Sequence, residues 1–442
     1  MNRIVLRHAC VVTLDEHEQF FPDGCVVIED GVIAAVGPSD TIPIYDEGEC
    51  DFHDRLLMPG LVNTHIHSHS PLFRNMGEDV VLQTWLQDIM WPAESYLTGE
   101  RAFWGTQLAC LESISGGVTT FADQFYYAQS TAEAIEQSGL RAFVCSTIFE
   151  NGKADAGQTL QTADDFLDDW KLRNALITPA LGPHAPYSVS AAQWREVAEL
   201  SARHGAIIHT HISETAMENR QINEAQGKSP SRWLADLGVL DRHVLAAHCV
   251  HLSDDDIGIL REHDVHVAYN PVSNLKLVSG IMPYQRLKKA GVQLSIGTDG
   301  AQSNNTLDLF QDLKIGALIQ KQAENDPTVF TVREAIRLAT IEGAKALGLQ
   351  DAVGSLEVGK QADIIAIDTT SPHLTPFHVD SAEIIYTALV YCVTGKDVTD
   401  TMVAGKWLMR GKQVLSFDPT TIIEEAGKIA RYIRRKTKQS AD

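Results

Sequence analysis

Three features are scarce in this sequence of 442 residues, and each absence excludes a class of protein. Cysteine occurs seven times, an odd number without a Cys-x-x-Cys pair, which is typical of a reducing cytoplasm and not of a disulfide framework. No apolar run approaches the ~18 residues of a membrane span, and Arg7 and His8 interrupt the apolar start, so we predict neither a span nor a signal peptide. Positive charge is also scarce. The formal net charge of −22 argues against nucleic acid or an anionic membrane as a partner, and we expect a cytoplasmic protein.

The rest of the composition, 44% hydrophobic and 21% charged, predicts a globular protein with a large core. Across residues 58–357, eight strand-like runs alternate with helix-like segments, an order typical of the α/β class and of the (β/α)8 TIM barrel. Residues 1–57 and 358–442 carry short alternating runs broken by Gly and Pro, and we expect these ends to form one small β-sandwich domain with a C-terminal helix. The barrel strand candidates are the run before His65 and residues 117–123, 141–147, 176–182, 206–213, 244–250, 265–270 and 292–298.

Two histidine pairs and an aspartate lie at the ends of these runs, which in a barrel form the catalytic face. His65 and His67 close the first run, and residues i and i+2 of a strand point to the same face, so both can reach one metal ion. His209 and His211 both face inward, so the pleat does not choose between them, but His211 lies nearer the strand's end. Asp299 closes the last run, and a buried carboxylate there needs a partner such as a cation. Imidazole nitrogen suits zinc or iron, so the pattern predicts a metal site.

Six stretches of the chain together resemble one known family. They look like the amidohydrolase superfamily and, more narrowly, its 5′-methylthioadenosine/S-adenosylhomocysteine deaminase branch, with triazine hydrolases and guanine deaminases as relatives. The resemblance covers nearly the whole chain in the right order, and its motifs are specific as a set. The stretches are residues 59–67, 182–187, 211–214, 248–251, 270–277 and 297–301.

The resemblance implies one divalent metal ion, zinc or alternatively iron, bound by His65, His67, His211 and Asp299. Many relatives hold two metal ions bridged by a carboxylated lysine on the fourth strand. Residues 176–182, the fourth strand candidate, contain no lysine, so we expect a mononuclear site. Bound zinc lowers the pKa of its water to about 7 and so supplies a nucleophile at neutral pH.

The resemblance also implies three catalytic residues, Asp299, Glu214 and His248. Asp299 accepts the proton of the attacking water, and Glu214 carries protons to a ring nitrogen of an aminopurine. His248 orients the nucleophile and stabilises the tetrahedral species, whose collapse releases ammonia. A plainer interpretation of Glu214 is an acid at the start of a helix, favoured by the helix dipole. Cys249, the neighbour of His248, points to the opposite face of its strand and is expected to pack in the core.

Substrate binding is implied for Glu94, His184 and Trp85. Glu94 lies in a Trp-Pro-Ala-Glu stretch where the family uses a glutamate to hold ribose hydroxyls, although a glutamate at a helix start after proline is an equally ordinary interpretation. His184 is the family's other ribose-side contact, and Trp85 either walls the pocket or packs in the core. Departures from the family pattern leave the contacts to the 5′ group and the loop over the base open. They are Cys145-Ser-Thr147, where some members have an arginine, Arg74-Asn75 and His69.

These residues lead to three hypotheses. The first is a hydrolytic deaminase of an adenosine thioether, S-adenosylhomocysteine or 5′-methylthioadenosine, and also of adenosine, which gives the inosine analogue and ammonia. The second keeps this chemistry on guanine, a pterin, an oxidised purine or a triazine, and rests on the altered loop at residues 69–78. The third is a metal-binding scaffold without catalysis, against which the full set of ligands and acid–base residues argues.

The superfamily also implies a homo-oligomer, a dimer or tetramer. We expect residues 428–438 to form a solvated basic helix rather than one that binds a membrane or nucleic acid.

Overall fold

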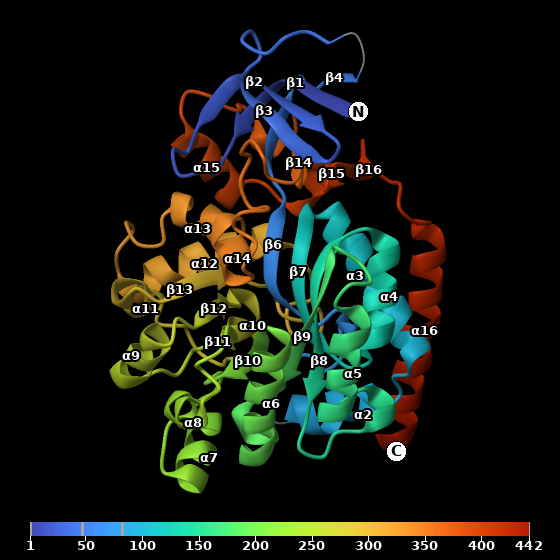
Figure 1. Ribbon diagram of the computed structural model, residues 1–442, viewed down its shortest axis with the longest axis vertical. Helices are drawn as coiled ribbons and strands as arrows, with labels where there is room; N and C mark the ends of the chain where they lie inside the picture. Colours follow the sequence, from blue (N-terminus) through green and yellow to red (C-terminus); the bar gives the residue numbers. More distant parts are fainter. Residues whose placement is uncertain (1, 46–47, 81–83, 442) are drawn as a thin grey trace.

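The computed structural model consists of a barrel and a β-sheet domain (Figure 1). It describes residues 2–45, 48–80 and 84–441, so that positions 1, 46–47, 81–83 and 442 of the predicted domains lie outside the described residues. Within the described ranges, no helix has both the length and the apolar composition needed to cross a membrane.

Eight parallel strands follow one another around the barrel in chain order, from β6 to β13. Their side chains are almost all buried, because the inner faces fill the barrel and the outer faces lie under helices. The barrel closes between its first and last strands, where Thr64 Oγ1 donates to the Ile296 carbonyl oxygen (2.9 Å). The predicted TIM barrel is confirmed. Its strands are β6 (Leu61–Ile66), β7 (Val118–Phe125), β8 (Arg141–Ile148), β9 (Ile177–Pro183), β10 (Ile208–Ile212), β11 (Val244–His248), β12 (His266–Tyr269) and β13 (Gln293–Ile296).

Helices connect the barrel strands and cover the outside of the barrel (Figure 1). Helix α6, for example, begins where Ser190 Oγ accepts the Gln193 N–H (3.4 Å) and ends at left-handed Gly205. The helices are α3 (Gly99–Ser115), α4 (Ala128–Ser138), α5 (Leu160–Trp170), α6 (Ala191–His204), α7 (Ala216–Gln226), α8 (Pro230–Asp236), α9 (Asp254–Glu262), α10 (Pro271–Lys276), α11 (Tyr284–Ala290), α12 (Leu309–Glu324), α13 (Val332–Leu338) and α14 (Ile341–Ala346). Short helical segments in the loops are η1 (Ser70–Phe73), η2 (Trp85–Met90), α2 (Trp91–Glu94), η3 (Ala154–Ala156) and η4 (Pro186–Ser188).

Both ends of the described chain contribute strands to one nine-stranded sheet. The two ends meet where β5 pairs with β14 in antiparallel register, and Arg55 there contacts the Asp368 carboxylate (3.3 Å). The sheet folds back on itself, since a Cβ added at Gly405 would lie only 2.4 Å from Gly31 Cα in another hairpin turn. The predicted β domain from both chain ends is therefore confirmed, while its boundaries stay a prediction. Its strands are β1 (Arg3–Val12), β2 (Phe20–Glu29), β3 (Val32–Pro38), β4 (Glu49–Asp51), β5 (Arg55–Pro59), β14 (Ile364–Asp368), β15 (Val398–Val403), β16 (Lys406–Arg410) and β17 (Gln413–Val414).

The C-terminal helix α16 (Pro419–Ala441) runs alongside the barrel from the β domain toward α2 (Figure 1). Its apolar face is buried through Ala426 and Ile433, which join a core cluster with Trp85 and Met90 of the loop after β6. The basic helix predicted at residues 428–438 thus exists, but only its outer face is solvated. The β domain also contains η5 (Pro372–Leu374), α15 (Ala382–Tyr391) and η6 (Gly395–Asp397).

Candidate active site

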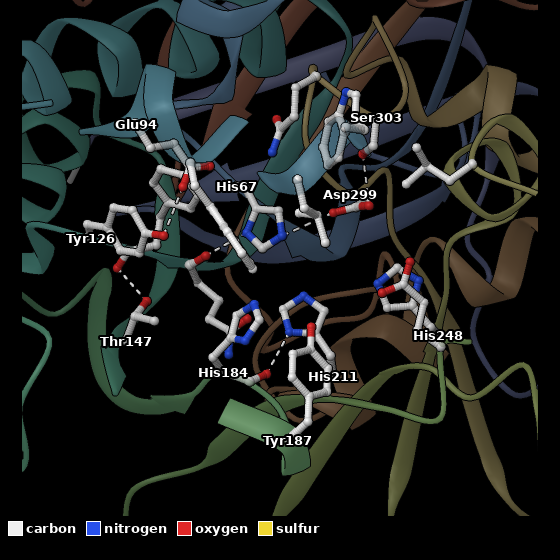
Figure 2. Close-up of a pocket in the computed structure, with 18 residues that line it drawn as sticks. His67, Glu94, Tyr126, Thr147, His184, Tyr187, His211, His248, Asp299 and Ser303 are labelled. Atoms are coloured by element: carbon white, nitrogen blue, oxygen red, sulfur yellow. Dashed lines mark hydrogen bonds and ion pairs between the residues drawn. The ribbon is translucent and has the colours of Figure 1, made fainter. Parts of the chain in front are cut away.

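One cavity at the carboxyl ends of the barrel strands gathers the predicted site residues (Figure 2). Figure 2 shows Glu94 and Tyr126 on one side of this cavity and His248 on the other, with His67 between them. Of the nine predicted site residues, only His65 is not part of the lining, because it is fully buried. The eight lining residues are His67, Trp85, Glu94, His184, His211, Glu214, His248 and Asp299.

Three histidines and Asp299 bring their ligand atoms together. His67 Nε2 lies 3.1 Å and His65 Nε2 lies 3.3 Å from Asp299 Oδ1. The sets His65–His67–His211 and His65–His248–Asp299 each offer ligand atoms that lie within 4.8 Å of one another. Such spacing suits coordination of a single ion, and no lysine is present in β9 to bridge a second one.

The other ring nitrogen of each histidine ligand candidate is already occupied. His67 Nδ1 lies 2.5 Å from the Gln124 carbonyl oxygen, and His211 Nδ1 lies 2.7 Å from the His184 carbonyl oxygen. These acceptors fix the proton on Nδ1 and leave Nε2 as a lone-pair donor, the arrangement found around metal-bound histidines. His65 Nε2 is buried and, among the described residues, has no hydrogen-bond partner. A metal ion would satisfy this buried atom, so the residues fit one divalent cation.

The pKa shifts of His65, His211 and Asp299 agree with metal binding, whereas that of His67 reflects its ion pair with Asp299. Burial lowers the pKa of His65 to about 4 and that of His211 well below its ordinary value, so both imidazoles are neutral. Burial works to raise the pKa of Asp299, but His65 and His67 hold it well below its ordinary value. For His67, burial opposes the charged form, yet the Asp299 carboxylate outweighs it and raises the pKa. The cluster therefore combines a carboxylate with imidazole donors.

Two serines, one in α10 and one in the loop after β13, fix the Asp299 carboxylate. Ser273 Oγ donates to Asp299 Oδ2 at 2.5 Å, and Ser303 Oγ donates to the same oxygen at 2.8 Å. Asp299 itself has a positive φ of 60°, which turns the chain sharply at the end of β13. Sequence reasoning missed both serines. Ser273 lies in α10, far from Asp299 in the sequence, and Ser303, although only four positions after Asp299, carries no local sign of the turn that brings its hydroxyl group back to the carboxylate.

Glu214 and His248 face the cavity from adjacent strands. Glu214 follows β10 and accepts a hydrogen bond from Ser279 Oγ (3.2 Å). His248 Nδ1 lies 2.8 Å from Asn274 Oδ1 and donates to it, which leaves Nε2 for the cavity. Cys249 is fully buried, and burial raises the pKa of its thiol, so it packs as predicted and does not act as a nucleophile.

A second polar group faces the metal cluster from the far side of the cavity. Tyr126 donates to Glu94 Oε2 (2.9 Å), and burial raises the pKa of Glu94 to about 7. His184 stacks on Phe149 with ring centroids 4.7 Å apart, and burial lowers its pKa to about 3. Trp85 lines the cavity and is also buried in the loop core, so both interpretations hold for it. Both interpretations of Glu94 also hold, because it belongs to the short helix α2 after Pro92 and its side chain lines the cavity. Tyr126 was missed because the run ending at residue 123 carried no predicted ligand.

Of the residues that depart from the family pattern, Thr147 lines the cavity, whereas His69 and Arg74 do not. His69 is fully buried, places Nε2 2.6 Å from Thr131 Oγ1 and is not part of the cavity lining. Arg74 pairs with Glu112 outside the cavity lining. Thr147 does line the cavity, so the position where some family members have an arginine faces the candidate active site.

An eight-stranded barrel with a His-His-His-Asp cluster at the carboxyl ends of its strands defines a metal-dependent hydrolase. The model of the amidohydrolase family matches residues 56–408, and the chain belongs to this family.

Similar proteins span the full length of the chain. It is 42% identical to a 5′-deoxyadenosine deaminase of Methanosarcina acetivorans over 96% of this chain and 97% of the relative. It is 40% identical to a 5-methylthioadenosine/S-adenosylhomocysteine deaminase of Desulforudis audaxviator over 98% of this chain and 99% of the relative. Among solved structures, an adenosine deaminase from Xanthomonas campestris with bound zinc is 33% identical, with a TM-score of 0.93 and 98% of each chain covered.

Proposed function

We propose that this protein is a zinc-dependent hydrolytic deaminase of adenosine thioethers and related 5′-modified adenosines. The observation that carries the proposal is the pairing, in one cavity, of the histidine–aspartate cluster with the Glu94 carboxyl group on the opposite side. A carboxylate on the side of the cavity opposite the cluster suits the vicinal diol of a ribose, while the cluster suits attack on the base. The relatives that act on 5′-deoxyadenosine and on methylthioadenosine or adenosylhomocysteine support the same substrate class.

His65, His67, His211 and Asp299 would hold the zinc ion. When bound, the ion supplies a water with a pKa near 7 as the nucleophile at neutral pH. The neutral imidazoles contribute Nε2 lone pairs, and the two serine hydroxyl groups on Oδ2 leave Asp299 Oδ1 free for the ion and for the proton of the attacking water.

The remaining acid–base work falls to Glu214 and His248. Glu214 delivers a proton to a ring nitrogen of the adenine as water adds to the amino-bearing carbon, and it regains one from the new hydroxyl group as the carbonyl forms. Asp299 passes the proton that it took from the attacking water to the leaving amine. His248, oriented by Asn274, directs the attacking water through Nε2. The sum of the reaction is substrate plus water to inosine analogue plus ammonia, so atoms and charge balance without a further reactant.

The test follows the ultraviolet change from adenine to hypoxanthine with purified, zinc-loaded protein. S-adenosylhomocysteine, 5′-methylthioadenosine and 5′-deoxyadenosine are compared, with Glu214→Gln as the matched inactive variant. We expect turnover of at least one substrate by the wild type and a loss of about 10²–10⁴-fold in the variant. Absence of any change with zinc-loaded wild type would remove the adenosine assignment.

The second hypothesis, a free base or triazine as substrate, rested on the altered loop at residues 69–78. Because His69 is buried against Thr131 and lies outside the described cavity lining, this loop gives the hypothesis no support.

A cytoplasmic location and a homo-oligomeric state also remain part of the proposal. All seven cysteines are free thiols, which supports a reducing compartment.

A further inference from the structure

The turn that carries Glu214 has a backbone shape that other parts of the chain must hold. Ser213, at the end of β10, has a positive φ of 53°, which is uncommon for a residue other than glycine. Its carbonyl oxygen accepts the N–H groups of Val250 (3.1 Å) and His251 (2.9 Å) from the loop after β11. The carbonyl side of the turn is therefore anchored to the neighbouring barrel strand.

The N–H side of the same turn is held by one buried carboxylate. Glu218 Oε1 accepts the Ser213 N–H (2.9 Å), and Glu218 Oε2 accepts the Glu214 N–H (2.8 Å). Glu218 is only 3% exposed and sits in the first turn of α7. Because its two oxygens bind two consecutive amides, the carboxylate fixes both the position and the rotation of the backbone at Glu214.

The carboxyl group of Glu214 is held from the opposite side by Ser279, whose Oγ donates to Oε1 (3.2 Å). The carbonyl oxygen of Ser279 lies 2.6 Å from His251 Nε2, which fixes this loop to the same neighbouring strand. Val278 is 85% exposed and has a φ of 55°, a strained conformation for a β-branched side chain. Gly280 has a φ of 130°, and a Cβ there would lie 2.8 Å from Val250 Cγ1. The loop thus keeps a strained backbone conformation that places the Ser279 hydroxyl group within hydrogen-bond distance of the Glu214 carboxyl group.

We propose that Glu218 and Ser279 are positioning residues that hold Glu214 in place for proton transfer, Glu218 through the backbone and Ser279 through the carboxyl group. This inference rests on the proposed function, in which Glu214 moves the protons. Proton transfer depends steeply on geometry, and a misplacement of about 1 Å can cost about 10²-fold in rate. A helix cap alone would stabilise α7 without affecting the rate.

The experiment compares Glu218→Gln and Ser279→Ala with Glu334→Gln in the full-length, zinc-loaded protein. Glu334 is the matched control: it also lies in the first turn of a helix, α13, and accepts a backbone N–H, that of Thr331 (3.1 Å), but it does not line the cavity. We expect kcat to fall by about 10–100-fold in Glu218→Gln and by about 3–10-fold in Ser279→Ala, with KM changed by less than about 2-fold. Ser279→Thr, which keeps the hydroxyl group, should restore most of the rate.

The proposal is overturned if Glu218→Gln lowers Tm as Glu334→Gln does but leaves kcat at the wild-type value. It is equally overturned if Ser279→Thr is as slow as Ser279→Ala. Should the wild type turn over no adenosine analogue, the proposed function fails by itself. Crystal structures of the wild type and of Glu218→Gln then decide the inference separately, since a displaced Glu214 carboxyl group supports positioning and an unmoved one contradicts it.

Discussion

His209 Nε2 lies 2.9 Å from His65 Nδ1, so one buried imidazole sets the tautomer of another. For His65 to offer Nε2 to a metal ion, Nδ1 must carry the proton and donate it to His209. His209 then donates through Nδ1 toward the Cys145 sulfur, 3.6 Å away. Burial lowers the pKa of His209 well below its ordinary value, so its imidazole is neutral at neutral pH.

Replacing His209 is therefore expected to weaken metal binding. His209→Leu removes the acceptor of the His65 Nδ1 proton, and loss of such a partner typically costs about 10–100-fold in metal affinity. The measurement is zinc retained after dialysis against graded chelator. His243→Leu is the control, because His243 precedes β11 at the other end of the barrel. Equal zinc retention in the two variants would contradict the role given to His209.

Glu94 is expected to make nucleoside binding depend on pH. Its pKa of about 7 means that the stronger acceptor, the carboxylate, forms only as the pH rises through that value. The inhibition constant of inosine, which is not deaminated, should therefore fall several-fold between about pH 6 and pH 8. In Glu94→Gln the constant should be higher, by about 10-fold, and independent of pH, whereas binding of a free base should not change. A pH dependence that persists in Glu94→Gln would rule out this residue as its source.

Metal removal is expected to abolish activity while the fold survives. Ser273 and Ser303 donate to Oδ2 of Asp299, and the Thr64 contact to β13 closes the barrel, so these contacts do not need the ion as a partner. Chelated protein should therefore keep its circular dichroism spectrum, lose turnover and regain it with added zinc. A chelated sample that unfolds, or that keeps full turnover, would argue against a catalytic metal.

The buried face of α16 is expected to support substrate binding at a distance. Ile433→Ala removes a fully buried side chain next to the loop of Trp85 and should lower the free energy of unfolding by about 2–5 kcal/mol. Because that loop also carries Glu94, we expect KM to rise several-fold with little change in kcat. Ile423→Ala, on the same helix but 57% exposed, is the control. An unchanged KM in Ile433→Ala would show that α16 contributes stability alone.

The sequence was sufficient to predict the barrel and the arrangement of its histidines, because strand periodicity and strand ends are local features. His65, His67 and Asp299 each follow a buried apolar run, and the closed barrel brings such ends together. Strand parity did not distinguish His211 from His209, since both point inward. Their different partners, the His184 carbonyl oxygen and the His65 ring, are visible only in three dimensions.

Residues that hold the site residues in place could not be predicted in the same way. Ser273 of α10 and Ser303 of the loop after β13 both donate to Asp299, and Tyr126 donates to Glu94 across 32 positions of sequence. Serine and tyrosine are common on any surface, so their local sequence carries no sign of these contacts. The same holds for α16, whose basic pattern predicted its outer face and gave no indication of the loop beneath its apolar face.

The pairing of β5 with β14 also sets an order of events during synthesis. Arg55 and Asp368 are in contact although 313 positions separate them. Strand β5 can therefore pair with β14 only after most of the polypeptide has been synthesised. The barrel strands, in contrast, pair with neighbours made shortly before them. The ribosome therefore delivers every metal ligand candidate before the β domain can be completed. The helix behind Trp85 is made last. A nascent chain halted before residue 419 would carry the whole metal cluster but lack the helix that packs against the loop of Trp85 and Met90.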